Sequence, residues 1–112
     1  MIIPLNDLIN SIPEEVRTKE IIEKVTKAYN SQQEYMLSIV NNAFKNNGNK
    51  NVDIECSIYP FRKAGSQLIA EFEMNNRSLP QRNSYNWHGQ NTSQWLYAGC
   101  ILIDNNEVSI HT

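Results

Sequence analysis

The chain has 112 residues, of which 40% are hydrophobic and 20% are charged, and it carries a net charge of −2 at pH 7. These values are typical of a single soluble domain that spans residues 1–112. They argue against a dedicated nucleic-acid binder, because phosphate binding depends on clustered Lys and Arg, and Arg62–Lys63 is the one adjacent basic pair.

We find no targeting or membrane segment in the sequence. Its first residues, MIIPLNDLIN, lack the basic stretch and the long apolar run of a signal peptide. No run approaches the roughly 20 apolar residues that a membrane span needs. We therefore expect a cytoplasmic protein without a membrane partner.

The first part of the chain, residues 1–48, is predicted to be helical. Asn6 or Asp7 can cap a short turn that runs to Ser11. Pro13 then fits the first position of a helix, and two glutamates follow it where carboxylates favour the helix dipole. Apolar residues recur after this point at helical spacing, which predicts one buried stripe.

The pattern leaves the number of helices open. Residues 31–34, Ser-Gln-Gln-Glu, have the form of a capping box, so a second helix can begin at Ser31. Gly48, flanked by Asn, is a usual end for such a helix. One long helix bent near Asn30 fits the same residues equally well.

The second part, residues 51–112, is predicted to form strands, and residues 52–59 and 68–74 alternate apolar and polar positions as half-buried strands do. Pro60 to Gly65 is predicted to be a turn, and Asp104 to Asn106 has the chemistry of a second turn that tolerates left-handed backbone. The third predicted strand is apolar on both faces, which is typical of a central strand. The predicted strands cover residues 52–59, 68–74, 95–103 and 107–111.

Helices followed by strands predict an α+β domain, with one or two N-terminal helices packed on a four-stranded antiparallel sheet. This arrangement is similar in shape to cystatin-like folds. The similarity is one of shape alone, because no motif identifies a family and such folds host many functions. The apolar third strand needs cover on both faces, so we expect a homodimer through the sheet or its edge.

Two cysteines, Cys56 and Cys100, fall in predicted strands. A disulfide between neighbouring strands is one interpretation, and reduced core cysteines are the commoner one. Their separation along the chain does not match a metal site. We therefore expect free thiols and no metal ion.

The longest connection, residues 75–94, is the most informative part of the sequence. It spans about 20 residues, whereas connections in compact domains usually run about 4–6. Its aromatic and arginine residues are of the types that dominate binding hot spots, although the aromatic side chains can instead close an open edge of the core. The predicted contact residues are Arg77, Arg82, Tyr85, Trp87 and His88.

A catalytic interpretation would start from His88. No carboxylate stands in the same connection to orient it, and Asp104, Glu71 or Glu73 would reach it only through the fold. The sequence has no nucleophile elbow, zinc-protease motif or phosphate-binding glycine loop. We therefore predict no catalytic residue and no cofactor.

Four carboxylates on the first two predicted strands can form an acidic patch on the outer face of the sheet. A solvated strand face explains them most simply. The same patch is a second candidate surface for contact with a basic partner. The four residues are Asp53, Glu55, Glu71 and Glu73.

Three functional hypotheses follow. The first is a small non-enzymatic binding protein that blocks or inhibits a protein partner, since the size, acidity and motif content resemble the profile of immunity proteins of toxin systems and of phage-encoded inhibitors of host defence. The second is a protein that sequesters a small polar ligand, such as a nucleotide, under the connection 75–94. The third is a small helix-plus-sheet enzyme with His88 as its base.

Overall fold

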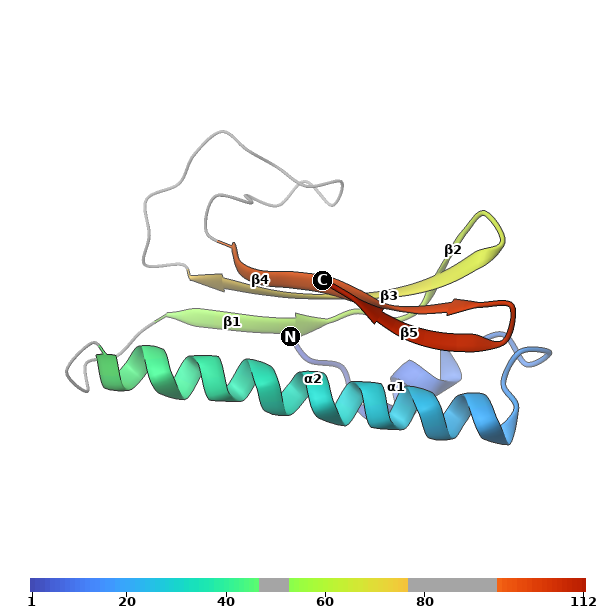
Figure 1. Cartoon of the computed structure of the whole chain (residues 1–112), viewed down its shortest axis with the longest axis horizontal. Helices are drawn as coiled ribbons and strands as arrows, with labels where there is room; N and C mark the ends of the chain where they lie inside the picture. The colour runs from blue at the N-terminus through green and yellow to red at the C-terminus, as the bar shows by residue number, and fades with distance from the viewer. Residues whose placement is uncertain (47–52, 77–94) are drawn as a thin grey trace.

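The computed structural model describes residues 1–46, 53–76 and 95–112. Two helices cover one face of an antiparallel sheet in which the strand order is β1-β3-β4-β5, and β2 also pairs with β3 (Figure 1). The predicted α+β architecture is confirmed. The elements are α1 (Leu5–Asn10), α2 (Lys19–Asn46), β1 (Ile54–Ile58), β2 (Arg62–Ala64), β3 (Gln67–Asn76), β4 (Trp95–Asp104) and β5 (Glu107–His111).

The start of the long helix differs from the prediction. Residues after Pro13 form a single turn, closed by hydrogen bonds from the Val16 and Arg17 N–H groups to the Pro13 carbonyl at 2.9 and 3.0 Å. Helix α2 begins only at Lys19, after Thr18. The Thr18 hydroxyl accepts a hydrogen bond from the Ile21 N–H at 3.2 Å and so satisfies one of the free donors at the helix start. The predicted start at Pro13 is therefore wrong.

Helix α2 is one continuous helix of 28 residues that passes through Asn30 and Ser31 without a break. The capping-box sequence at Ser31 is not used, because the buried face of the helix continues on both sides of it. Tyr29 and Met36 lie on this face, before and after Ser31, and both are buried against the sheet. Burial of a continuous apolar stripe outweighs a local capping signal. Of the two alternatives, the single helix is the correct one.

The strand pattern follows the predicted alternation. Strand β3 is paired with β4 over almost its whole length, from Leu68 opposite Ile103 to Asn75 opposite Trp95, with a register shift after Met74. Every second side chain of β3 faces the helices and is buried, whereas those between them point to the outer face. The buried set is Leu68, Ala70, Phe72 and Met74.

Two details of the sheet extend the prediction. Residues 62–64, expected in a turn, form the short strand β2, which pairs with the start of β3. Strand β3 also runs on through Asn76, so the connection to β4 covers residues 77–94 rather than 75–94.

The core lies between the sheet and the two helices. Leu8 of α1, Val25 of α2, and Phe72 and Ile101 of the central strands are all at most 1% exposed. Within the described residues, no helix has the length and apolarity to cross a membrane. The core therefore fixes β3 and β4 firmly against α2.

Candidate functional site

All five predicted contact residues lie in the connection 77–94, outside the described residues, so their role stays a prediction. They are Arg77, Arg82, Tyr85, Trp87 and His88. The structure does describe the two strand ends to which this connection is attached. The connection leaves the end of β3 and returns at the start of β4, and the pairing of Asn75 with Trp95 holds these two ends side by side.

These strand ends contact the long helix through one tyrosine near the start of β4. The Tyr97 hydroxyl donates a 2.6 Å hydrogen bond to Oε1 of Gln32, which is buried in α2. The Tyr97 ring also packs 4.9 Å from the ring of Tyr35 and 5.5 Å from that of Phe72, measured between centroids. These contacts fix the strand ends that carry the connection relative to α2.

One polar atom at this end of the sheet is unusual. Within the part of the chain that the structure describes, the side-chain oxygen of Asn75 is the one buried side-chain polar atom without a hydrogen bond. A buried acceptor without a donor is destabilising by about 1–3 kcal/mol.

Three of the four predicted patch carboxylates share the outer face of the sheet, because the register places Ser57 opposite Glu73 and Glu55 opposite Asn75. Asp53 lies just before β1. The three carboxylates on the outer face take part in defined contacts. Arg62 Nε donates to Glu71 Oε1 at 3.0 Å.

The polar side chains of the outer face are therefore linked by hydrogen bonds rather than isolated from one another. The Tyr59 hydroxyl donates to Glu73 Oε1 at 2.7 Å, and Glu73 is only 4% exposed. A shallow hollow of about 360 Å³ lies on this face between Arg62, Ile69 and Cys100. Glu55 lies 3.7 Å from the N-terminal ammonium group and Glu71 lies 3.0 Å from Arg62, so the negative charge that this surface presents is partly neutralised within the chain.

The carboxylates that could have oriented His88 have other partners. Glu71 and Glu73 are held by Arg62 and Tyr59, and Asp104 accepts a hydrogen bond from Gln67 Nε2 at 3.2 Å. Asp104 also lies at the end of β4 that is remote from the connection 77–94. Nothing in the described geometry favours the catalytic interpretation of His88.

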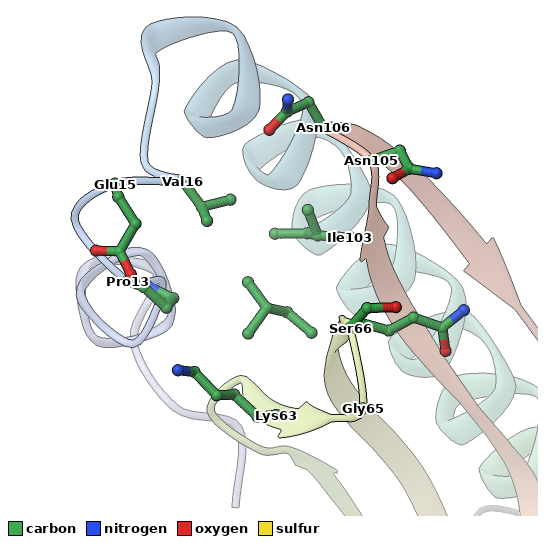
Figure 2. A pocket seen from close by; sticks show the side chains of 11 residues that line it. Pro13, Glu15, Val16, Lys63, Gly65, Ser66, Ile103, Asn105 and Asn106 are labelled. Carbon is green, nitrogen blue, oxygen red and sulfur yellow. The ribbon is translucent and has the colours of Figure 1, made fainter.

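A second hollow, of about 390 Å³, lies at the opposite end of the sheet (Figure 2). Val16 and Ile103 point toward each other across it and, with Leu68, give it an apolar floor. Glu15 and Lys63 stand on one side of the hollow, and both are exposed.

The other side of this hollow is made by two tight turns. Asn105 and Asn106 have φ values of 51° and 62° and join β4 to β5, and Gly65, at 64°, joins β2 to β3. Positive φ at both central residues is typical of a type I′ hairpin, and Asn and Gly adopt it with the least strain. The predicted turn chemistry at Asp104 to Asn106 is confirmed.

Sequence reasoning did not find this hollow. The second hypothesis placed a ligand beneath the connection 75–94, but this hollow adjoins the first residues of β3, whereas the connection adjoins its last. Ten strand residues separate the two ends, which corresponds to roughly 30 Å. The signal available in the sequence was the pair of turn motifs, Gly65–Ser66 and Asn105–Asn106, which end neighbouring hairpins.

The two cysteines are free, and the register explains why they do not form a disulfide. Cys56 is opposite Met74 on the helix-facing side of the sheet, whereas Cys100 is opposite Glu71 on the outer face. Burial raises the pKa of both thiols. The neighbouring Glu71 charge raises the pKa of Cys100 further, and Arg62 opposes this effect. Both thiols are therefore poor nucleophiles at neutral pH.

Comparisons of the chain with protein-family models, with curated proteins and with solved structures find no match in any of the three. Function is therefore inferred from the residues and their geometry.

Proposed function

We propose that the chain is a small non-enzymatic binding protein that blocks or inhibits a protein partner, with residues 77–94 as the principal contact region. The observation that carries the proposal is the way in which this region is attached to the sheet. Its two ends leave neighbouring strands at Asn75 and Trp95. Loops positioned by a rigid scaffold are the usual carriers of binding residues.

The composition of the region supports the same function. Trp, Tyr and Arg supply most hot spots at protein interfaces, because each buries a large area and also offers a polar group. Attachment to rigid strand ends also lowers the conformational entropy that is lost on binding. Trp87 is the residue on which we expect binding to depend most.

The acidic outer face is the second part of the proposed contact. Glu55 and Glu71 lie on it, beside the N-terminal ammonium group and Arg62 respectively, and keep 42% and 21% of their side-chain surface exposed. Complementary charge mainly accelerates association and makes it sensitive to salt. We therefore expect a partner with a basic surface, as in the immunity-protein or anti-defence type of inhibitor.

The test is capture of a partner from a lysate of the source cells, followed by measurement of its affinity for single variants. Trp87→Ala should weaken binding by more than about 1 kcal/mol, while the circular dichroism spectrum stays unchanged. Phe44→Ala is the matched control, because Phe44 is an aromatic residue on α2 that is 38% exposed. Wild-type affinity in Trp87→Ala would refute the proposal.

A second candidate function, the sequestration of a small polar ligand, is favoured by the hollow at the far end of the sheet. Its volume of about 390 Å³ falls within the range of small-molecule sites. Its apolar floor, with Glu15 and Lys63 at the rim, suits a ligand that has an apolar body and charged groups. Native mass spectrometry of gently purified protein tests this candidate. A mass of a few hundred daltons that is lost on denaturation would favour it over a protein partner.

A further inference from the structure

The sheet has one edge that the described residues leave open. Strand β5 (Glu107–His111) pairs with β4 on one side, and no described strand pairs with its other side. Ser109, Ile110 and His111 are exposed along it. The opposite edge of the sheet differs, because Ile2 bridges to Ile58 of β1. An open strand edge is a template for pairing with another chain.

We propose that β5 pairs antiparallel with β5 of a second copy of this chain, with the two-fold axis at Ser109. In this register Val108 faces Ile110 of the second copy, and Glu107 faces His111. The same two pairs recur on the other side of the axis, as a two-fold interface requires. Apolar and hydrogen-bonded cross-strand pairs both stabilise antiparallel sheets, and a histidine ring can hydrogen-bond to a carboxylate, so the sequence of β5 is complementary to itself.

A groove beside β5 is placed to receive the side chains that this pairing adds. Val108 and Ile110 are opposite Ile103 and Ile101 in the register, so they lie on the helix-facing side. Between them and α2 lies a groove of about 390 Å³, lined mainly by apolar surface. Its walls include Ala28 on α2. Val108 and Ile110 of the second copy would enter this groove from the new strand.

The charges around the groove are compatible with β5 of a second copy, and they also suit one alternative, an acidic peptide. Lys24 is paired with Glu20 on the same helix at 3.0 Å, so it adds little net repulsion between two copies. Lys27 also lines the groove, and it would favour an acidic extended peptide from a different protein. The self-complementary register of Glu107 and His111 favours the second copy, because a foreign peptide has no reason to match it.

Cross-linking at the axis tests the register directly. Residue 109 would face its own counterpart at about 4.5–5.5 Å between Cα atoms, a separation that a disulfide spans. Ser109→Cys should therefore form a reducible covalent dimer under mild oxidation. Leu102→Cys is the matched control on the same face, because Leu102 is opposite Ser109 on β4 and outside the proposed pairs. Its two copies would lie about 14 Å apart, which is three strand spacings. Wild-type protein, with only Cys56 and Cys100, should stay uncross-linked.

Sedimentation velocity over a range of concentrations tests the pairing of Glu107 with His111. Wild-type protein should approach twice the chain mass of 12.9 kDa. Glu107→Lys should raise the dimer dissociation constant roughly tenfold, because two attractive cross-strand pairs are lost. The double variant Glu107→Lys, His111→Glu should restore dimerisation.

Several results would overturn the proposal. These are a wild-type monomer at the highest soluble concentration, equal cross-linking of Ser109→Cys and Leu102→Cys, or a dimer unaffected by Glu107→Lys. Glu107→Lys and Ser109→Cys leave the sequence of residues 77–94 unchanged, so partner capture by a monomeric variant tests the proposed function separately from the dimer. Failure of this inference is therefore distinguishable from failure of the proposed function.

Discussion

At the scale of single residues, the absence of a side chain at Gly99 makes room for the ring of Phe72. The two residues are directly opposite in the register, and Phe72 is 1% exposed. A Cβ atom built on Gly99 would lie 2.8 Å from two atoms of the Phe72 ring, and it would also meet the backbone oxygen of His111. The glycine therefore leaves the space that the ring fills.

We predict that Gly99→Ala destabilises the protein by about 1–3 kcal/mol, because the added methyl group must displace a buried ring or a strand backbone. Urea unfolding followed by circular dichroism measures the loss. Ala98→Ser, at the neighbouring half-buried position on the outer face, should change the stability by less than about 0.5 kcal/mol. Equal stability of Gly99→Ala and wild type would show that Phe72 can move without cost.

At the scale of elements, the strands were predictable and the helix start was not. Alternation revealed the first two predicted strands because each has one face against the core, as the buried side chains of β3 show. An apolar run revealed the central strand β4, and the turn at residues 104–106 indicated the last strand. Strand β2 carries no such alternation, and it forms because Arg62 to Ala64 pair with the start of β3. Pro13 gave a strong local signal for a helix start, yet Thr18 provides the cap that the fold uses. Local patterns do not report which of several capping sites the tertiary structure selects.

The two candidate capping residues give a direct test at this scale. Thr18→Ala should destabilise the protein by about 1 kcal/mol, because the Ile21 N–H loses its side-chain acceptor. Ser31→Ala should cause no loss, because Ser31 is exposed in the middle of a continuous helix, where alanine is the better helix former. Thermal or urea unfolding of the two variants compares them. A larger loss for Ser31→Ala would mean that a helix begins at Ser31 after all.

At the scale of the whole molecule, the sheet offers different surfaces at its two ends and along its free edge. One end of the β3–β4 pair carries the connection 77–94, and the other end carries the hollow between Val16 and Ile103. The sequence indicated the first of these surfaces, because its length and residue types stand out locally. It did not indicate the second, because the hollow combines residues from three separate segments that only the fold brings together.

The structure suggests a way to remove the proposed contact region while keeping the fold. Because Asn75 and Trp95 are paired, replacing residues 77–94 with Asn-Gly would leave a three-residue hairpin loop that ends in glycine. Loops of this length with glycine at the last position are a common closure for antiparallel strands. The shortened chain would retain every described element.

The most direct test of the proposed function compares this shortened chain with wild type in partner capture and in urea unfolding. We predict that the shortened chain unfolds cooperatively with a circular dichroism spectrum close to that of wild type, and that it captures no partner. Capture at the wild-type level would contradict the proposal by placing the contact elsewhere on the molecule. Loss of cooperative folding would also contradict it, because residues 77–94 would then serve to close the core.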